Sequence, residues 1–469
     1  MQTPKTTQLP KEIFKAYDIR GIVGKTLTPA IVELIGHALG SEAKQRGQST
    51  ICIGYDGRLS GPELAAALSL GIRNAGIDVV NLGMVATPMV YFAAYHLKTN
   101  CGVMVTGSHN PPDYNGLKMV LAGETLSTDS IQSLRTRIEE NNFTFGDGAE
   151  RKYSIADDYI NTIKADINLA RPMRVAVDCG NGVAGAFAKQ LYNAIGCNVE
   201  ELFCEVDGHF PNHHPDPSVP ENLIDLINTL KTSRSELGLA FDGDGDRLGV
   251  VTKDGHIIYP DRQLMLFAEE VLNHNPQASI IFDVKSTRNL TPWITKRGGK
   301  AVLWKTGHSL VKAKIKEIDA AMAGEMSGHV FFNDHKNGKK RWFGFDDGLY
   351  AGARLLEILS RTNNPSAVLN HLPDSFSTPE QHINMKEGEP HVLIAQLQKT
   401  ADFAGATEII TIDGLRVEYA DGFGLMRASN TTPVIVLRFE ADSEAALKRI
   451  QAQFKAIIWA AAPHVALPF

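Results

Sequence analysis

The sequence predicts an α/β fold of three related α/β domains with mainly parallel mixed sheets, followed by a C-terminal α+β domain. Three observations predict this fold: the length, a strand–helix–strand pattern that occurs three times, and a different pattern near the C-terminus. At 469 residues the chain is too long for one hydrophobic core, so three or four domains are expected.

The repeated pattern occupies residues 51–82, 174–203 and 279–304. Each segment begins with a short apolar strand, continues through a glycine- or serine-containing turn and a helix, and ends in a second strand. The first strand of each segment leads into an aspartate: Asp56, Asp178 and Asp283. Strands that alternate with helices of this length indicate βαβ units and a mainly parallel sheet.

The C-terminal segment follows another plan. Two strand-like runs surround Asp413-Gly414, which predicts a β-hairpin. A further strand is expected at 434–441, and residues 443–459 have helical periodicity. We therefore predict an antiparallel sheet with helices here, and domains that span 1–155, 156–255, 256–370 and 371–469.

Composition narrows the class of function. The 47 basic and 53 acidic residues give a net charge of −6, which argues against a nucleic-acid surface but permits an anionic substrate. The N-terminal residues have no apolar stretch typical of a signal peptide, and the apolar run at 456–462 is too short to span a membrane. Five scattered cysteines favour reduced thiols. We expect a cytoplasmic protein without nucleic-acid or membrane partners.

The segment Asp242-Gly-Asp244-Gly-Asp246 follows an apolar strand and predicts a metal site. Three carboxylates this close repel one another unless a cation lies among them, and hard oxygen ligands suit Mg²⁺ or Ca²⁺. An EF-hand is excluded, because Arg247 and Lys253 stand where glycine and glutamate are required. Asp246 also argues against an aspartyl phosphohydrolase. The remaining alternative is an acidic, solvated turn.

The loop 106–112 follows another strand and places Ser108 on a glycine turn, where it could act as a nucleophile. Thr106 and Asn110 exclude the hydrolase nucleophile elbow. Taken alone, the segment is equally typical of a surface turn. Lys118 would supply a cation beside a phosphate.

Two weaker motifs complete the set. Residues 427–433 combine Arg427 with hydroxyl and amide donors, which suits a phosphate, although the composition is also that of an ordinary loop. Residues 324–329 offer a carboxylate, a hydroxyl and an imidazole between glycines, a set that can bind sugar hydroxyls. For His213 and His214 we favour a loop role over zinc binding, because the ligand spacing is not typical of zinc.

Together, TGSHNP, DGDGDR, GEMSGH and RASNTTP, in this order, resemble the four active-site loops of the α-D-phosphohexomutase family. The resemblance is strongest to its bacterial phosphomannomutase/phosphoglucomutase branch and covers nearly the whole chain. The segment KAYDIRG at 15–21 is similar to the family's N-terminal active-site segment.

The resemblance implies four domains around a central cleft, with a phosphoserine at Ser108. Mg²⁺ would be bound by a phosphoserine oxygen and by Asp242, Asp244 and Asp246, and Arg247 would contact the transferring phosphate. Further cleft residues are Tyr17, Arg20, His109, Lys118, Lys285, His308 and His329. The residues that would bind the sugar are Glu325, Met326, Ser327, Gly328 and His329. Those that would bind the second phosphate are Arg427, Ala428, Ser429, Asn430 and Thr431. Proton transfer stays open among Arg20, His109, Lys118 and His329.

The resemblance therefore predicts reversible interconversion of hexose 1- and 6-phosphates of mannose and glucose through a 1,6-bisphosphate. Glucose 1,6-bisphosphate is the expected activator, and a monomer is expected. The alternatives are a phosphoglucosamine mutase of the same family, a metal-dependent sugar phosphatase and a non-catalytic sugar-phosphate binder.

Overall fold

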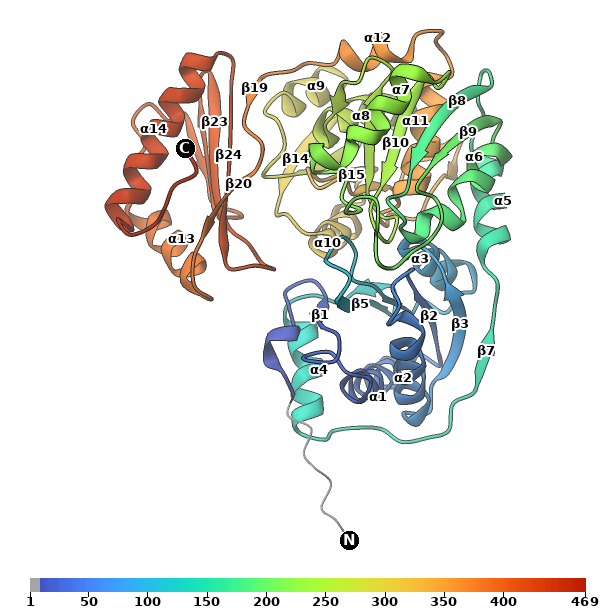
Figure 1. Cartoon of the computed structure of the whole chain (residues 1–469). Helices are drawn as coiled ribbons and strands as arrows, with labels where there is room; N and C mark the ends of the chain where they lie inside the picture. The colour runs from blue at the N-terminus through green and yellow to red at the C-terminus, as the bar shows by residue number, and fades with distance from the viewer. Residues whose placement is uncertain (1–8) are drawn as a thin grey trace.

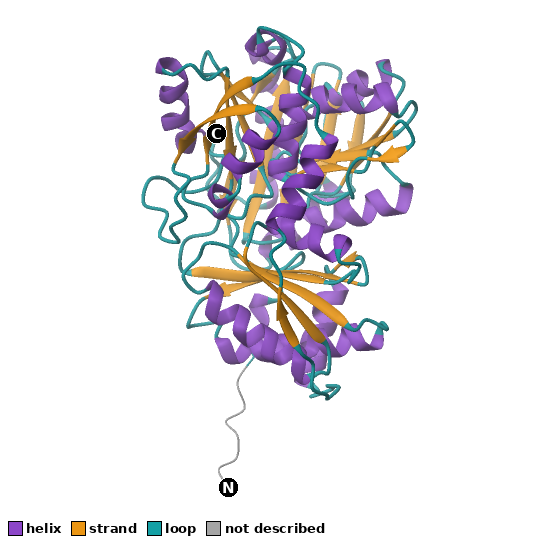
Figure 2. Cartoon of the chain, turned by 90° about the vertical axis from the view of Figure 1, so that its right-hand side faces the viewer, coloured by secondary structure: helices purple, strands orange, loops and turns teal. Residues whose placement is uncertain are grey.

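The computed structural model describes residues 9–469. Three α/β units are stacked against one another, and the C-terminal α+β unit stands beside the second and third (Figure 1). The view turned by 90° shows helices on both sides of the strands (Figure 2). The prediction that the chain has no signal peptide rests partly on residues 1–8, which lie outside the described part.

The first unit is built on a seven-stranded sheet in the order β1-β5-β4-β2-β3-β7, with β6 beside β5. Its strands are β1 (Ile19–Ile22), β2 (Thr50–Tyr55), β3 (Asp78–Met84), β4 (Gly102–Val105), β5 (Tyr114–Leu121), β6 (Glu124–Thr125) and β7 (Glu150–Lys152). Helices α1 (Pro29–Gln45), α2 (Gly61–Asn74) and α4 (Asp129–Glu139) cover one face, and α3 (Thr87–His96) covers the other (Figure 1). The 3-10 helix η1 (Lys11–Ile13) precedes β1.

The second unit has a five-stranded sheet in the order β12-β11-β10-β8-β9. The strands are β8 (Met173–Asp178), β9 (Cys197–Leu202), β10 (Leu237–Phe241), β11 (Leu248–Thr252) and β12 (Ile257–Ile258). Its helical segments are α5 (Ala156–Asp166), η2 (Val183–Ala186), α6 (Ala188–Ala194), η3 (Pro220–Leu223) and α7 (Ile224–Thr232). Strand β10 runs parallel to β8 and antiparallel to β11, so the sheet is mixed as predicted.

The third unit has a four-stranded sheet in the order β14-β13-β15-β16 and a separate hairpin of β17 and β18. The strands are β13 (Ser279–Asp283), β14 (Lys300–Trp304), β15 (Met322–Gly324), β16 (Val330–Phe332), β17 (His335–Lys336) and β18 (Lys339–Lys340). The helices are α8 (Pro260–His274), α9 (Leu290–Lys296), α10 (His308–Ile318), α11 (Gly348–Leu359) and α12 (Pro365–Asn370).

The C-terminal unit has a six-stranded sheet, antiparallel at every pairing: β19-β24-β23-β22-β21, with β20 also beside β24. The strands are β19 (Phe376–Ser377), β20 (Gln381–Asn384), β21 (Glu408–Ile410), β22 (Leu415–Tyr419), β23 (Gly422–Ala428) and β24 (Val434–Ala441). Helices α13 (Glu389–Thr400) and α14 (Glu444–Ala461) lie on its outer side (Figure 1). The Ser443 side chain caps α14 by accepting a hydrogen bond from the Ala446 N–H.

The hydrophobic cores do not divide as the sheets do. One cluster of buried side chains extends from α3 through the second and third units, while the other side of the first sheet has its own cluster. The C-terminal unit also has a separate core. The three α/β units therefore share apolar packing, and the C-terminal unit joins them through a small apolar cluster of Val284, Phe423 and Leu425 together with polar contacts. Within residues 9–469, none of the helices combines the length and apolar character that a membrane crossing requires.

Candidate active site

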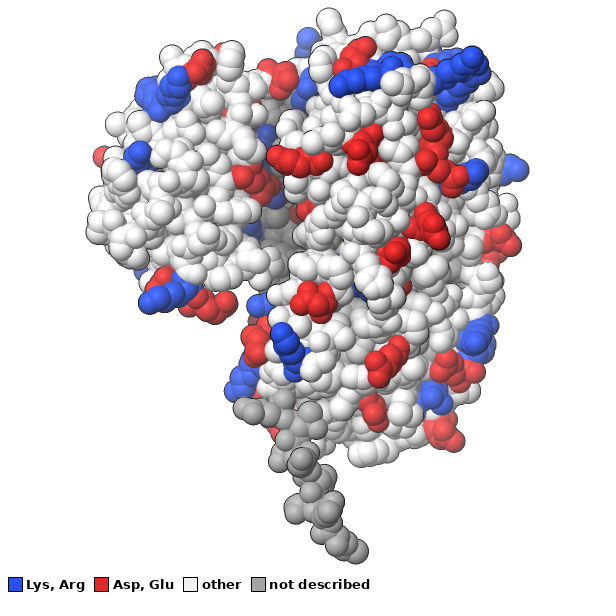
Figure 3. All heavy atoms as spheres, viewed as in Figure 1, with Lys and Arg blue, Asp and Glu red and all other residues white. Residues whose placement is uncertain are grey.

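The four motif loops extend from the ends of strands, one in each unit. The Ser108 loop follows β4 and the aspartate loop follows β10, while the other two connect β15 to β16 and β23 to β24. A space-filling view shows the surface hollowed between the C-terminal unit and the rest of the chain, with charged side chains visible inside (Figure 3).

Ser108 is buried and held in an unusual backbone conformation. Its φ of 49° lies in the left-handed region, which non-glycine residues rarely occupy. The Ser108 hydroxyl donates to Asp242 Oδ2 at 3.1 Å, and its Oγ lies 3.2 Å from His109 Nδ1. The first and second units thus meet at the predicted nucleophile.

The predicted metal ligands form a compact buried group. One carboxylate oxygen from each of Asp242, Asp244 and Asp246 lies within 4.8 Å of the others. Burial and the charges of its two neighbours raise the pKa of Asp242 well above its usual range. Asp244 Oδ1 and Asp246 Oδ1 are buried without a hydrogen-bond partner in the described residues. Buried oxygens left free in this way fit a hard cation such as Mg²⁺.

Lys118 supplies the counter-charge from β5. Its Nζ lies 2.7 Å from Asp244 Oδ2 and 2.5 Å from Asp246 Oδ2. Burial disfavours the ammonium, but the aspartates outweigh it and raise the pKa of Lys118. Because β5 pairs with β4 with Lys118 opposite Met104, the sheet itself carries this cation towards the serine loop.

Two arginines border the same group. Arg247 Nε lies 3.7 Å from Asp242 Oδ2, and Arg20 donates to Asn110 Oδ1 at 2.7 Å within the serine loop. Arg20 also pairs with Asp18 at 2.5 Å. The site therefore combines a hydroxyl, an acidic pocket and several cations within a few ångströms, which suits phosphoryl transfer.

Three predicted residues join the sugar loop to this group. His329 Nε2 lies 3.3 Å from Asp246 Oδ1, and its Nδ1 lies 2.7 Å from Ser327 Oγ. The His329 ring stacks on that of His308 at 5.7 Å. Burial, followed by the charges of Lys312 and Lys118, lowers the pKa of His308 well below its usual range. His109 has a pKa lowered in the same way, by burial and by Arg247, Arg20 and Lys118.

The remaining residues of the sugar loop, 324–329, form hydrogen bonds within the third unit. Glu325 is buried and accepts a hydrogen bond from the Gly307 N–H at 2.5 Å, and burial raises its pKa. The Met326 N–H donates to Asp283 Oδ1 at 3.3 Å, and Gly328 adopts a φ of 98°.

The phosphate loop, residues 427–433, contacts the rest of the site through Tyr17. The Tyr17 hydroxyl donates to the Thr306 carbonyl at 2.9 Å and accepts a hydrogen bond from Asn430. Arg427 pairs with Asp413 at 3.0 Å. Ser429 hydrogen-bonds with the loop residues Thr431 and Thr432, and Ala428 lies on β23 opposite Ile435. Lys285 pairs with Glu380 of the C-terminal unit at 2.6 Å. Through these contacts the C-terminal unit meets the first and third units.

Sequence reasoning missed several residues that shape the site. Arg58 is buried and donates to the carbonyls of Ser108 and Asn110 at 2.8 and 2.6 Å. Thr87 donates to Asp244 Oδ2 at 2.5 Å. Asp346 is buried between Lys312, at 2.7 Å, and the two histidines, His308 and His329, at 3.8 and 3.9 Å. Among these, only Asp346 lies in a local pattern that could have indicated it, the paired aspartates of FDDG at 345–348.

The histidine pair of the second unit serves its loop. His213 Nε2 lies 3.1 Å from Asp178 Oδ1, and the His214 ring hydrogen-bonds with the His109 carbonyl. The second of these contacts ties the loop to the serine segment.

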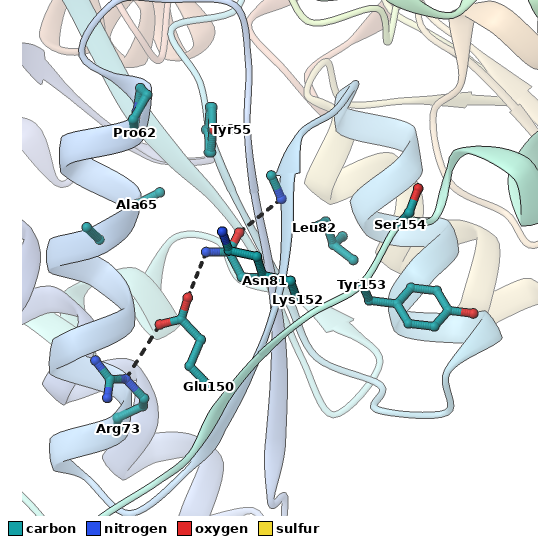
Figure 4. A pocket seen from close by; sticks show the side chains of 12 residues that line it. Tyr55, Pro62, Ala65, Arg73, Asn81, Leu82, Glu150, Lys152, Tyr153 and Ser154 are labelled. Atoms are coloured by element: carbon teal, nitrogen blue, oxygen red, sulfur yellow. Dashed lines mark hydrogen bonds and ion pairs between the residues drawn. The ribbon is translucent and has the colours of Figure 1, made fainter.

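A separate cavity of about 550 Å³ lies in the first unit, between α2 and residues 150–154 (Figure 4). Its walls include Tyr55, Arg73, Asn81, Glu150 and Lys152. None of the predicted site residues lines it, so the chemistry belongs to the hollow between the loops.

Sequence models of one protein family match the chain almost from end to end. The match comprises the phosphoglucomutase/phosphomannomutase alpha/beta/alpha domains I, II and III, at residues 11–145, 157–255 and 259–376, and the C-terminal domain, at 383–457.

Individual proteins give the same result. A phosphoglucomutase of Neisseria meningitidis serogroup A is 61% identical over 453 residues, covering 96% of this chain and 97% of the relative. A phosphomannomutase/phosphoglucomutase of Pseudomonas aeruginosa is 55% identical over 470 residues, covering 100% of both. A crystal structure of a phosphoglucomutase/phosphomannomutase family protein from Burkholderia thailandensis is 57% identical, has a TM-score of 0.93 and covers 98% of this chain and 100% of its own. The family and fold class predicted from the loops and repeats are thereby confirmed, and the chain belongs to the phosphoglucomutase/phosphomannomutase family of α-D-phosphohexomutases.

Proposed function

We propose that this chain reversibly interconverts the 1- and 6-phosphates of mannose and glucose through a phosphoserine at Ser108 and a hexose 1,6-bisphosphate. The observation that carries the proposal is the position of Ser108 Oγ, 3.1 Å from Asp242 Oδ2 and next to the buried aspartate group. Membership of the mutase family and the names of the relatives favour this function over a phosphoglucosamine mutase or a phosphatase.

Phosphoryl transfer is chiefly a matter of alignment and charge neutralisation. A bound Mg²⁺ would neutralise charge on the transferring phosphoryl group, and the three aspartates, with a phosphoserine oxygen, would hold it. Lys118, Arg247 and Arg20 would bind and orient the remaining phosphoryl oxygens. The left-handed backbone at Ser108 supports this role, because it keeps Oγ pointed at the acidic pocket.

A second phosphate site is required, because the bisphosphate must turn over and return its other phosphoryl group to Ser108. We assign this site to Arg427, Ser429, Asn430 and Thr431, with Lys285 and Tyr17 beside it. Arg427 is buried and ion-paired, so its guanidinium is pre-oriented towards a phosphate. Glu325 and Ser327 would hold sugar hydroxyls between the two phosphates. Mannose and glucose differ at O2 only, so a loop that leaves O2 uncontacted accepts both.

We assign proton transfer at the substrate hydroxyl to His329. Ser327 and Glu325 lie against its Nδ1, at 2.7 and 3.4 Å. Its Nε2 faces Asp246, at 3.3 Å, and Arg247 Nε, at 3.4 Å, beside the predicted metal ligands. His109 is the candidate for proton transfer at the Ser108 hydroxyl. Its Nδ1 lies 3.2 Å from Oγ, and its lowered pKa keeps the ring neutral and able to accept a proton.

The finer expectations belong to the same proposal. Glucose 1,6-bisphosphate would activate the enzyme by phosphorylating Ser108, and the enzyme would act as a cytoplasmic monomer without nucleic-acid or membrane partners. A net charge of −6 and the reduced cysteines support this setting.

The test is ³¹P NMR of the protein with Mg²⁺, a trace of glucose 1,6-bisphosphate, and α-mannose 1-phosphate or α-glucose 1-phosphate in separate samples. Appearance of both 6-phosphates is expected, and Ser108→Ala should abolish it while the circular dichroism spectrum stays unchanged. Ser154→Ala, at an exposed serine of the separate cavity, is the matched control.

Each other outcome has a defined meaning. Inorganic phosphate as the product would make the chain a phosphatase. Turnover of glucosamine 1-phosphate alone would favour the phosphoglucosamine mutase. Full activity in Ser108→Ala would overturn the phosphoserine mechanism.

A further inference from the structure

Two cysteine sulfurs are in contact beneath the aspartate loop. Cys179 Sγ lies 3.5 Å from Cys204 Sγ. Cys179 directly follows β8 and Cys204 lies just beyond β9, and these neighbouring parallel strands bring their carboxyl ends side by side. The pair is therefore fixed by the sheet register, although 25 residues separate the cysteines in sequence.

The two thiols differ in access to solvent. Cys204 is half-buried, whereas Cys179 has no exposed surface. The hydrogen bond between the thiols, followed by burial, raises the pKa of Cys179 well above its usual range. A small oxidant would therefore meet Cys204 first, with Cys179 already in contact behind it.

The backbone around Cys179 connects this pair to the predicted metal ligands. The Cys179 carbonyl accepts a hydrogen bond from the Gly182 N–H at 2.7 Å, and the next N–H, of Val183, donates to the Gly243 carbonyl at 3.2 Å. A Cβ on Gly182 would lie 3.0 Å from Gly243 Cα, so the two loops touch without spare room. Gly243 stands between Asp242 and Asp244.

We propose that Cys179 and Cys204 form a peroxide-oxidisable dithiol site whose disulfide distorts the aspartate loop and lowers activity. The Cys204 sulfur attacks one peroxide oxygen, the O–O bond breaks, and Cys204 becomes a sulfenic acid while the departing oxygen leaves as water. Cys179 then attacks the Cys204 sulfur, the S–O bond breaks, and the sulfenic oxygen leaves as a second water with the Cys179 proton. One peroxide is reduced and two thiols are oxidised.

The disulfide would move atoms that the aspartate loop rests on. Forming the bond shortens the sulfur separation from 3.5 Å to about 2.0 Å, so the loops after β8 and β9 must approach each other. A shift of Cys179 would disturb the bond between its carbonyl and the Gly182 N–H, and through it the contact of Val183 with Gly243. A dithiol reductant reverses the bond, so a reducing compartment keeps the pair in its thiol form.

The test treats the full-length protein with hydrogen peroxide, assays mutase activity, then unfolds a sample in urea, blocks the remaining thiols with N-ethylmaleimide and analyses the peptides by mass spectrometry. We expect a peptide cross-linked between residues 179 and 204, two of the five cysteines protected from alkylation, and a loss of activity on the order of tenfold. Dithiothreitol should restore both. Cys204→Ser should keep normal activity and resist the peroxide, whereas Cys197→Ser, a change at the first residue of β9, should stay sensitive.

Three results would overturn the inference: no 179–204 cross-link, a complete cross-link with unchanged activity, or equal peroxide loss in Cys204→Ser. Cys179→Ala is a second variant, but the conclusion does not depend on it, because Cys204 is the more exposed partner and its serine variant preserves the packing. The cross-link is measured by mass alone, so it is independent of the proposed mutase function.

Discussion

Arg58 illustrates how much of the site depends on a single buried side chain. Its guanidinium donates to three carbonyls of the serine loop, at Ser108, Asn110 and Pro111, and to that of Tyr114 at the start of β5, over distances of 2.5 to 3.0 Å. It also lies 3.3 Å from the buried Asp56 carboxylate. These contacts hold the loop that carries Ser108 in its left-handed conformation.

We predict that Arg58→Lys destabilises the protein by about 3 kcal/mol and lowers the rate of Ser108 phosphorylation, because one ammonium cannot replace a planar fork among several carbonyls. Urea unfolding and intact-mass measurement of the phosphoprotein test this. Arg46→Lys, on the surface ion pair with Glu42, should change stability by less than about 0.5 kcal/mol. Equal stability of the two variants would contradict the role of Arg58 in holding the serine loop.

A pH effect is expected at His213. Burial opposes its charge, but the Asp178 carboxylate at 3.1 Å outweighs burial and raises the pKa of His213. A raised pKa in the folded state means that the stabilisation is fully present below the ordinary histidine pKa of about 6.5 and is lost as the pH rises through the folded value. The pair is partly solvated, so its contribution should stay below about 1 kcal/mol.

His213→Gln should therefore be less stable than the parent near pH 6 and equally stable near pH 9, as measured by urea unfolding at about these two values. The exposed His464→Gln is the control and should follow the parent at both. A deficit in His213→Gln that grows with pH would refute the assigned sign.

The residues that sequence could not predict share one property. The aspartates of 242–246 occupy one short window, whereas Arg58 and Thr87 meet their partners from 50 and 157 positions away. Arg58 is buried by residues that are distant in the sequence, and no local sequence pattern distinguishes it from a surface arginine. Recognition of the loops named the residues that we propose face a substrate, but it did not name those that support them.

At the scale of elements, the repeated strand–helix–strand pattern predicted three parallel pairs, and β2–β3, β8–β9 and β13–β14 are parallel. Sequence missed β7, because Glu-Arg-Lys is exposed and lacks an apolar alternation. Polar contacts hold β7 at the sheet edge: Glu150 accepts hydrogen bonds from Ser69 and Asn81 and lies 3.7 Å from Arg73 (Figure 4).

Helices α1 and α2 cross so closely that a methyl group does not fit between them. A Cβ on Gly71 would lie 2.0 Å from the Glu33 carbonyl oxygen, which is backbone and cannot turn aside. Gly71→Ala should therefore cost about 3 kcal/mol or more despite the higher helix propensity of alanine. Thermal unfolding checks this, with Ala66→Ser on the exposed face of α2 as a near-neutral control. A stabilised Gly71→Ala would contradict the packing.

At the scale of the whole molecule, α3 explains why the shared core was not foreseen. This helix is apolar along most of its length, which fits a buried position but does not indicate which elements it packs against. In the structure it joins the core of the second and third units. The predicted boundaries near 155, 255 and 370 stay predictions. The continuous core of the three α/β units offers no gap that marks the first two.

The C-terminal unit is attached to the third unit through arginine side chains and a small apolar cluster of Val284, Phe423 and Leu425. Arg416 donates to the carbonyls of Val284 and Ser286, both at 2.7 Å, and Arg438 donates to the Lys285 carbonyl at 2.6 Å. Its link to the first unit is Tyr17, whose hydroxyl bonds to Thr306 of the third unit and to Asn430. An interface with several polar contacts and only a small apolar cluster permits movement between units.

Tyr17→Phe should therefore loosen closure of the hollow without detaching the C-terminal unit, because the Arg416 and Arg438 contacts remain. A compact chain of this length has a radius of gyration of about 23 Å, and we expect a rise of roughly 1 Å by small-angle X-ray scattering. The KM for hexose phosphate should rise by more than kcat falls, since binding would have to draw the units together. Tyr153→Phe, which loses only a local bond to Asp158, is the control. If Tyr17→Phe matches that control in both radius and KM, the Tyr17 hydroxyl does not hold the units together.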